Sequence, residues 1–378
     1  MKKIDKSTRI LHIVSTLNYS NGTMAVIMNY YKKIDKSKIQ FDFLYMFEND
    51  KNNYENDILD LGGKVYRIKS PYNFITFKKE YNNFLKNHAK EYDVFHLHEI
   101  YFNFFFFFGI SKYGIKHKIV HSHTDKYSDN FLGKIKNFLL YKTMYFVASD
   151  FFACSKSAAK IMSLPKNKEV FFLNNAIDIC KYRFDENIRE TYRKKLKLEN
   201  CFVLGNVGRL NNQKNPFFML DIFYEVYSKK ANARLVLVGD GPLKTKLIKK
   251  AKQMGIYDKI IFFGQTKKVN EVLNIFDVFV LPSLFEGLGI VLIESQANGI
   301  TTFTSTCVPQ ETNLSSLITY LDLKKGASYW ANMILKSKVN DFKNRSKYNQ
   351  LLQQSEYNIH NEIAKLENIY LKIIERGD

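Results

Sequence analysis

The sequence predicts an α/β protein of two doubly wound domains, whose parallel sheets face each other across a cleft. Three observations support this fold class. Short apolar runs of strand length alternate with amphipathic stretches of helix length, which favours parallel sheets with right-handed crossovers. The apolar runs are continuous, as expected of strands that are buried on both faces. Finally, 378 residues are too many for one ordinary core and suit two domains of about 150 to 200 residues.

The expected strands fall into two sets, separated by the polar segment 178–200, which we expect to be a linker. The first set comprises 9–15, 41–46, 64–68, 93–100, 118–123, 149–154 and 169–175, and the second comprises 202–210, 233–241, 259–266, 277–283 and 300–305. Helical patterns cover 215–231, 242–255 and 290–299, and a last one begins near 355. Ligands of such sheets bind beyond the carboxyl ends of the strands, so residues at those ends are the candidates for a site.

Composition narrows the classes of function. Lys and Arg outnumber Asp and Glu 57 to 37, for a formal net charge of +20, and the surplus is spread over both halves. It favours anionic ligands or an anionic membrane face as partners, and no nucleic-acid motif accompanies it. The four cysteines are scattered, which argues against a disulfide framework or a structural zinc site and for a reducing compartment.

No segment of the sequence has the length of a membrane span. The longest apolar stretch, 101–110, has about ten residues where a span needs about twenty, and the apolar run 10–14 is too short for a signal peptide. We therefore expect a cytoplasmic protein. The segments 101–118 and 133–147, which mix aromatic residues with lysine, leave two interpretations open. They are buried helices with a basic edge, or they dock on the cytoplasmic face of an anionic membrane.

The best candidate for a site is the segment 281–299, "LPSLFEGLGIVLIESQANG". Glu286 lies in a glycine-containing turn after an expected strand, and Glu294 lies about one and a half turns into the following helix. The glycines allow the backbone to approach a ligand, and the N–H groups at the start of the helix can bind an anion. A phosphate there would leave one carboxylate for a sugar and the other for a ribose. An isolated E-x7-E spacing is more often a pair of surface glutamates, but the strand–turn–helix context favours a site.

The stretch "FEGLGIVLIESQANG" resembles the E-x7-E signature of the GT-B glycosyltransferases of family four. "GNVGRLNNQKNP" is similar to the family's glycine–arginine–x4–lysine segment, and 235–247 and 260–289 follow in the family's order. The first half is similar more loosely, and the tail from Cys307 resembles the subgroup that builds bacterial capsular and exopolysaccharides.

The resemblance implies a retaining enzyme with two Rossmann-like domains in the GT-B arrangement. Residues 1–180 would form an acceptor-side domain, completed by a C-terminal crossover helix at about 356–378. Residues 181–355 would form the domain that binds the nucleotide sugar.

The resemblance also implies roles for residues at matching positions. Arg209 and Lys214 would stabilise the leaving diphosphate in place of a metal, because no D-x-D motif occurs in the chain. Glu286 would hold hydroxyls of the donor sugar rather than attack it, and Glu294 would bind the ribose. His123 would lie beside the donor sugar and complete the catalytic set. Further donor-binding positions are Gly22, Thr23, Gly239, Gln265, Gly287, Leu288 and Gly289.

Two positions depart from the family's pattern. Asn21 replaces the first of two glycines in the loop before the first helix, and Asn175 stands where the family usually has glycine. Because asparagine tolerates the left-handed backbone region better than most residues, we expect the turn at Asn21 to be kept.

Two His-x-His pairs, His96/His98 and His121/His123, stand at the ends of expected strands, each pair on one face. Four histidines could gather around zinc, but no Cys, Asp or Glu completes either motif locally. We therefore expect no metal, and histidines that are structural or contact the sugar.

The sequence thus predicts a hexosyltransferase without cofactor or metal. It would move a hexose or N-acetylhexosamine from a nucleotide diphosphate sugar, with UDP-sugar favoured, to a growing, lipid-linked cell-surface glycan. Nucleic acid is not expected as a partner, and peripheral association with the inner membrane face stays open. One alternative is a catalytically silent GT-B subunit that stabilises a partner enzyme, suggested by the altered first loop. The presence of Glu286, Arg209, Lys214 and Glu294 argues against that alternative.

Overall fold

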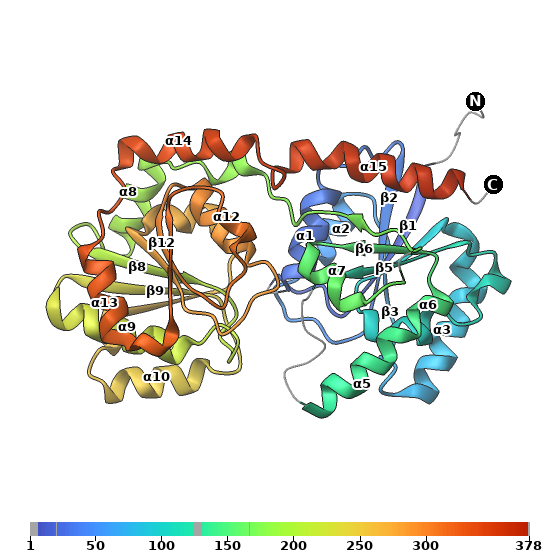
Figure 1. Cartoon of the computed structure of the whole chain (residues 1–378), viewed down its shortest axis with the longest axis horizontal. Helices are drawn as coiled ribbons and strands as arrows, with labels where there is room; N and C mark the ends of the chain where they lie inside the picture. Colours follow the sequence, from blue (N-terminus) through green and yellow to red (C-terminus); the bar gives the residue numbers. More distant parts are fainter. Residues whose placement is uncertain (1–6, 20, 124–130, 166, 377–378) are drawn as a thin grey trace. The chain divides into compact units, whose positions relative to one another are not determined.

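The computed structural model describes residues 7–19, 21–123, 131–165 and 167–376 (Figure 1). The chain divides into two compact units, residues 1–176 with 359–378 and residues 177–358. Each unit contains a parallel sheet with helices on its faces, which confirms the predicted class of two Rossmann-like domains. The sequence predicts domain boundaries at residues 180 and 355. That these residues limit domains that fold independently stays a prediction.

The N-terminal unit holds a seven-stranded parallel sheet in the order β3-β2-β1-β4-β5-β6-β7. The strand order reverses between β1 and β4, which pair directly, with His12 opposite His96. All seven strands overlap segments that the sequence predicts. They are β1 (Thr8–Val14), β2 (Ile39–Tyr45), β3 (Val65–Arg67), β4 (Val94–Leu97), β5 (His117–Ser122), β6 (Asp150–Ala153) and β7 (Phe171–Phe172).

Helices cover this sheet, and one of them comes from the C-terminal end of the chain. Helix α15 (Ile359–Glu375) buries Leu366, Tyr370 and Ile373 in the N-terminal unit, although it follows the other unit in sequence. The other α-helices of this unit are α1 (Gly22–Tyr31), α2 (Glu55–Asp60), α3 (Phe74–His88), α4 (Asn103–Phe107), α5 (Phe131–Lys142), α6 (Met144–Val147) and α7 (Lys156–Met162).

The C-terminal unit holds a six-stranded parallel sheet in the order β10-β9-β8-β11-β12-β13, which reverses between β8 and β11. Alternate residues of β9 face two separate cores: Leu235 and Leu237 lie in one, Val236 and Val238 in the other. The strands are β8 (Phe202–Val207), β9 (Ala233–Val238), β10 (Ile260–Gly264), β11 (Val278–Leu281), β12 (Thr301–Ser305) and β13 (Ile318–Leu321). The sequence did not predict β13, because this short edge strand is largely half-buried and contains no continuous apolar run.

The α-helices of the C-terminal unit are α8 (Glu186–Lys195), α9 (Pro216–Lys229), α10 (Lys244–Gln253), α11 (Val269–Val272), α12 (Ile290–Ala297), α13 (Gly326–Lys336) and α14 (Phe342–Gln353). The prediction that 178–200 is a linker is wrong, since α8 and the short helix η4 (Ile179–Tyr182) are part of this unit. Arg189 and Arg193 of α8 are buried and pair with the two oxygens of Asp277, at 2.5 and 2.7 Å. The buried residues of α8 are arginines, so this helix looks polar in sequence although it packs against the unit.

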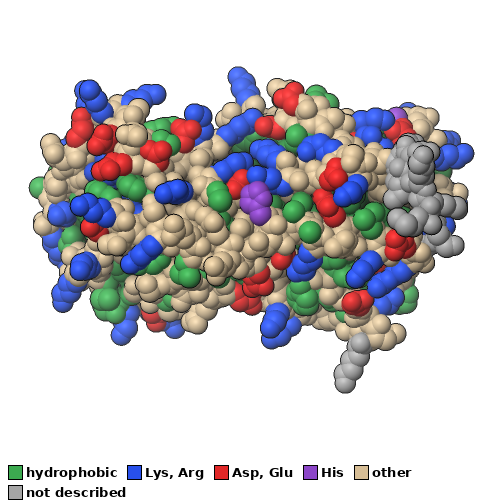
Figure 2. All heavy atoms as spheres, turned by 90° about the horizontal axis from the view of Figure 1, so that it is seen from above, with side chains coloured by type: hydrophobic (Ala, Val, Ile, Leu, Met, Phe, Trp, Pro, Cys, Tyr) green, Lys and Arg blue, Asp and Glu red, His purple; other side chains and the backbone are tan. Residues whose placement is uncertain are grey.

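On the face that Figure 2 shows, Lys and Arg side chains outnumber acidic ones and are scattered among them, as an evenly spread surplus requires. Within the ranges that the structure describes, no helix has the length and apolarity needed to cross a bilayer.

Candidate functional site

The candidate site in the C-terminal unit lies at the carboxyl ends of β8 and β11, the two neighbouring strands where the strand order reverses. The loop after β8 carries Arg209 and Lys214, and the turn after β11 carries Glu286. The Leu284 N–H donates to the carbonyl of Gln213 at 2.8 Å, so the backbones of the loop and the turn are tied together. Such a reversal in a parallel sheet is a common place for ligands to bind.

The carboxylate of Glu286 is buried and held by three side chains. The Lys214 ammonium lies 2.6 Å from Oε1, and the Ser283 hydroxyl donates to the same oxygen at 2.6 Å. The Gln213 amide donates to Oε2 at 3.4 Å. Glu286 is 4% exposed, so removal of the lysine would leave a buried charge with fewer partners. The structure therefore joins Lys214 and Glu286 as one ion pair, an arrangement that the sequence did not predict.

Arg209, by contrast, is exposed, and its side chain makes no hydrogen bond or ion pair with the residues that the structure describes. It is a cation that is available to a ligand.

Glycines bring the loops after β8, β9 and β10 into backbone contact. The Gly239 N–H donates to the carbonyl of Gly264 at 2.8 Å, and the Gly208 N–H donates to that of Val238 at 2.9 Å. Gly239 has φ +128°, and a Cβ at this position would lie 2.1 Å from the carbonyl oxygen of Gly208. Gly239 is therefore required by packing. The neighbouring Gln265 is partly buried, and its Oε1 is enclosed without a hydrogen-bond partner in the part of the chain that the structure describes.

Glu294 lies on α12, and its surroundings differ from those of Glu286. The Tyr182 hydroxyl donates to its Oε1 at 2.8 Å. Burial raises the pKa of Glu294 to about 7, although this hydrogen bond and the charge of Lys214 act in the opposite direction. Near neutral pH this carboxyl group therefore exchanges between its neutral and charged forms.

The start of α12 is shaped by the glycine turn. Gly289 caps the helix with φ +79°, a left-handed conformation that suits glycine, and Gly287 precedes it in the turn. The side chain of Leu288 is buried in a core cluster with Ile177 and Ile293. Leu288 can therefore meet a ligand through its backbone only.

The predicted loop residues of the N-terminal unit lie at the start of α1. Gly22 is exposed and Thr23 is partly buried. Asn21 does not use the left-handed region: its φ is −87°, and its side chain caps α1 by accepting from the Met24 N–H at 3.2 Å. An N-cap satisfies a free helical N–H, which accounts for asparagine at this position without any ligand.

His123 follows β5 and belongs to a cluster of five histidines in the N-terminal unit. His123 Nε2 lies 2.8 Å from His98 Nδ1, and His98 Nε2 lies 2.9 Å from His12 Nδ1. His96 Nε2 lies 3.2 Å from His121 Nδ1. The structure thus brings both His-x-His pairs together and adds His12, which the sequence did not single out.

Four further residues at these strand ends were not predicted. Gln213 and Ser283 hold Glu286. Gln213 directly precedes Lys214, and Ser283 lies three residues before Glu286, so their positions in the two motifs could have indicated this role. Tyr182 reaches Glu294 from a distant segment, for which the sequence holds no signal. Glu99 follows β4, and burial raises its pKa although hydrogen bonds from Ser15 and Tyr101 oppose this.

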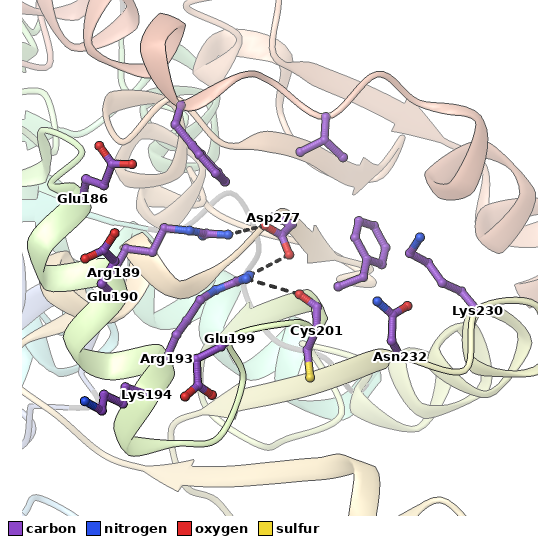
Figure 3. Close-up of a pocket in the computed structure, with 13 residues that line it drawn as sticks. Glu186, Arg189, Glu190, Arg193, Lys194, Glu199, Cys201, Lys230, Asn232 and Asp277 are labelled. Carbon is purple, nitrogen blue, oxygen red and sulfur yellow. Dashed lines mark hydrogen bonds and ion pairs between the residues drawn. The ribbon is translucent and has the colours of Figure 1, made fainter.

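A pocket of about 680 Å³ lies elsewhere, at the amino ends of strands in the C-terminal unit (Figure 3). Asp277, which precedes β11, lies at its centre with Arg189 and Arg193 directed toward it. Because this is the sheet edge opposite to Glu286, and because carbonyl groups and Asp277 satisfy both arginines, we regard the pocket as a structural feature.

Comparison with known proteins shows which proteins share this fold and part of this sequence. Residues 188–313 match the family model described as glycosyl transferases group 1. The structure is similar to the crystal structure of Anabaena HepE in complex with UDP and glucose, with a TM-score of 0.78 and 14% identity, covering 97% of this chain and 100% of that one. The chain therefore has the GT-B fold, and the family comparison supports a glycosyltransferase of group 1.

Two curated proteins are similar over nearly the whole length. The chain is 29% identical to the putative glycosyltransferase EpsF of Bacillus subtilis over 371 residues, 96% of each chain. It is 22% identical to the capsular polysaccharide biosynthesis glycosyltransferase CapH of Staphylococcus aureus, over 96% of this chain and 98% of that one.

Proposed function

We propose that the protein is a retaining hexosyltransferase that moves a hexose or N-acetylhexosamine from a UDP-sugar to a growing, lipid-linked cell-surface glycan. The observation that carries this proposal is the ion pair of Lys214 with Glu286 at the reversal of the C-terminal sheet, beside the glycine-capped start of α12. Arg209 lies in the same loop as Lys214. Cations, free N–H groups and a fixed carboxylate are what a sugar diphosphate needs at the moment its diphosphate leaves.

In this proposal the two cations have different tasks. Arg209 has no side-chain partner to give up among the described residues, so it can bind the diphosphate oxygens with a planar fork of donors. Lys214 keeps Glu286 charged and oriented, and shares its own charge with a phosphate when the donor is bound. Glu286 then accepts hydrogen bonds from the sugar hydroxyls and does not act as a nucleophile.

The choice of donor and acceptor has two supports. UDP and glucose are named in the HepE complex, and capsular polysaccharide biosynthesis is named for CapH. Exposed aromatic residues of the N-terminal unit, such as Phe108 and Phe146, favour an acceptor that is presented at a membrane surface. We propose further that transfer needs no divalent metal, because no D-x-D motif is present.

The experiment is to incubate the protein with a panel of nucleotide sugars and a lipid-linked acceptor, and to measure released nucleotide with and without chelator. We expect nucleotide to be released from a UDP-sugar, and we expect this release to persist in the presence of chelator. The anomeric configuration of the product linkage, axial or equatorial, should match that of the donor.

Arg209→Ala should lower turnover at least ten-fold, which corresponds to about 1.4 kcal/mol. Arg234→Ala, at the amino end of β9, is the control and should retain turnover. Wild-type turnover in Arg209→Ala would contradict the assignment, and nucleotide binding without any transfer would favour the silent-subunit alternative.

A further inference from the structure

Five histidines gather on one face of the sheet in the N-terminal unit. They come from three adjacent strands: His12 from β1, the pair His96/His98 from β4 and the residue after its end, and the pair His121/His123 from β5 and the residue after its end. Two-residue spacing places both members of each pair on the same face. The ring centroid of His98 lies 5.1 Å from that of His123 and 5.4 Å from that of His121.

The hydrogen bonds within the cluster leave buried nitrogens without partners. One chain runs from His12 through His98 to His123, and a second runs from the Tyr370 hydroxyl through His96 to His121. His12 Nε2, His121 Nε2 and His123 Nδ1 are enclosed and have no partner among the residues that the structure describes. His12 and His121 are each only 2% exposed. A buried polar atom without a partner is energetically unfavourable, so such atoms call for a water or an ion.

The chemistry of the cluster suits a metal ion. Burial of His12, His96, His98 and His121 favours the neutral form of their imidazole rings. Neutral imidazole is the form that binds zinc and its neighbours among the divalent transition metals. Two overlapping triads have ligand atoms within 4.8 Å of one another: His12, His96 and His98, and His98, His121 and His123.

We propose that His98, His121 and His123 form a binding site for one divalent transition metal ion of the zinc and cobalt class. This triad is favoured over the other because His121 Nε2 has no partner among the described residues and an ion can replace the single contact between His98 Nδ1 and His123 Nε2. In the other triad, both nitrogens of His96 are engaged. His123 is also only partly buried, which gives an ion a way in and leaves a coordination position for water.

The remaining members of the cluster would orient the ligands. With the metal on His98 Nδ1 and His123 Nε2, the proton of His98 sits on Nε2 and is donated to His12 Nδ1. With the metal on His121 Nε2, the proton of that ring sits on Nδ1 and is donated to His96 Nε2, whose own Nδ1–H is donated to the Tyr370 hydroxyl. All rings stay neutral, so binding needs a change of tautomer and no net loss of protons. Such partners of metal ligands commonly raise affinity.

This inference departs from the sequence-based expectation of no metal at the His-x-His pairs. That expectation looked for a Cys, Asp or Glu close in sequence, whereas the third imidazole comes from the neighbouring strand. The inference does not rest on the proposed function, because Arg209 and Lys214, which would serve the diphosphate, belong to the other unit.

The test uses the full-length untagged chain, stripped with chelator, equilibrated with ZnCl2 or CoCl2 and freed of excess metal by gel filtration. Elemental analysis should find about one metal ion per chain. X-ray absorption of the wild-type zinc form should show at least three nitrogen scatterers at about 2.0 to 2.1 Å with imidazole features. His12→Gln keeps the three ligands but removes a hydrogen-bonding partner, and should weaken zinc binding about ten- to a hundred-fold.

His98→Gln and His121→Gln should lose the bound metal. His88→Gln is the matched control, because His88 lies in the same unit but hydrogen-bonds Glu91 outside the cluster. Wild-type protein that emerges without stoichiometric metal would overturn the proposal and indicate a metal-free chain of imidazoles. Undiminished metal in His98→Gln would overturn it as well. If the ligand variants fail to fold, absorption spectra of the wild type decide: an oxygen or sulfur shell, or fewer than three imidazoles, excludes this site.

Discussion

At the scale of single residues, the two glutamates of the segment 281–299 have opposite surroundings. Glu286 is buried in an ion pair with Lys214, whereas Glu294 is held by the neutral hydroxyl of Tyr182. Two carboxyl groups whose environments differ in this way usually have different tasks. This supports the proposal that they bind different parts of the donor.

We predict that Glu294→Gln weakens the binding of bare UDP. The substitution removes the carboxylate, and with it charge-assisted hydrogen bonds to the ribose that are worth up to about 3 kcal/mol. Glu286→Gln should leave UDP binding intact or slightly stronger, since it releases Lys214, and should reduce sugar transfer. Calorimetry with UDP on both variants is the measurement. Equal losses of affinity, or no loss in either, would mean that the glutamates do not divide the donor.

The pKa of Glu294 predicts a pH dependence of nucleotide binding. If the carboxylate form accepts the ribose hydrogen bonds, affinity should rise about ten-fold between pH 6 and 8, as a group with pKa of about 7 ionises. UDP also ionises in this range, so the measurement is the difference between the wild type and Glu294→Gln. An identical pH profile in both would contradict the prediction.

The same raised pKa has an effect of opposite sign on the free energy of unfolding. Because the folded state holds the proton more tightly than the unfolded state, stability falls as pH rises from about 4.5 to about 7.

At the scale of elements, the sequence predicted those strands that form continuous apolar runs, because both their faces are buried. It failed where a buried surface is polar. The arginines of α8 made a structural helix look like a linker, and the edge strand β13 has no such run. Of the candidate site, the sequence could place Lys214 and Glu286 at neighbouring strand ends. It could not show their ion pair, the contact of Tyr182 with Glu294, or the addition of His12 to the histidine pairs, because these are contacts between distant segments.

The loops at the carboxyl edge of the C-terminal sheet should depend on Gly239. Gly239→Ala requires a left-handed φ and places a Cβ against the Gly208 carbonyl, at a cost on the order of 1 to 3 kcal/mol. The melting temperature should fall by about 2 to 4 °C for each kcal/mol. Gly22→Ala is the control, because its φ is not positive and the added Cβ meets no atom within 4 Å. Similar melting temperatures for the two variants would show that the loops are not packed as described.

Helices of the N-terminal unit present the apolar side chains that a membrane surface would accept. Phe108, after α4, is 67% exposed, and Phe146 of α6 is 87% exposed. The double variant Phe108→Ser/Phe146→Ser should bind anionic vesicles at least about ten-fold more weakly than the wild type, because apolar burial at the interface is lost. Leu351→Ser, on α14 of the other unit, is the control. Vesicle sedimentation is the measurement, and equal binding by wild type and double variant would exclude these side chains from docking.

At the scale of the whole molecule, the chain passes between its two units twice, near residues 176 and 358. Consequently the C-terminal unit is continuous in sequence, while the N-terminal unit needs α15 to complete it. Glu362 of α15 accepts from the Asn174 N–H at 3.4 Å, and Glu367 accepts from the Asp35 N–H at 2.9 Å. The two units should therefore respond differently when they are produced alone.

We predict that residues 177–358 fold alone and bind UDP with nearly the affinity of the full chain. This segment has cores on both faces of its sheet and contains Arg209, Lys214 and Glu294, the residues proposed to bind the nucleotide, together with Tyr182, which holds Glu294. Cooperative thermal unfolding and calorimetry with UDP are the measurements, and Glu294→Gln in the fragment is the control. A folded fragment that does not bind UDP would show that the N-terminal unit supplies part of the nucleotide site.

Residues 1–176 alone should unfold at a lower temperature than the same segment mixed with a peptide of residues 356–376. Without α15, the His96 ring and the backbone near Asn174 lose their hydrogen-bonding partners.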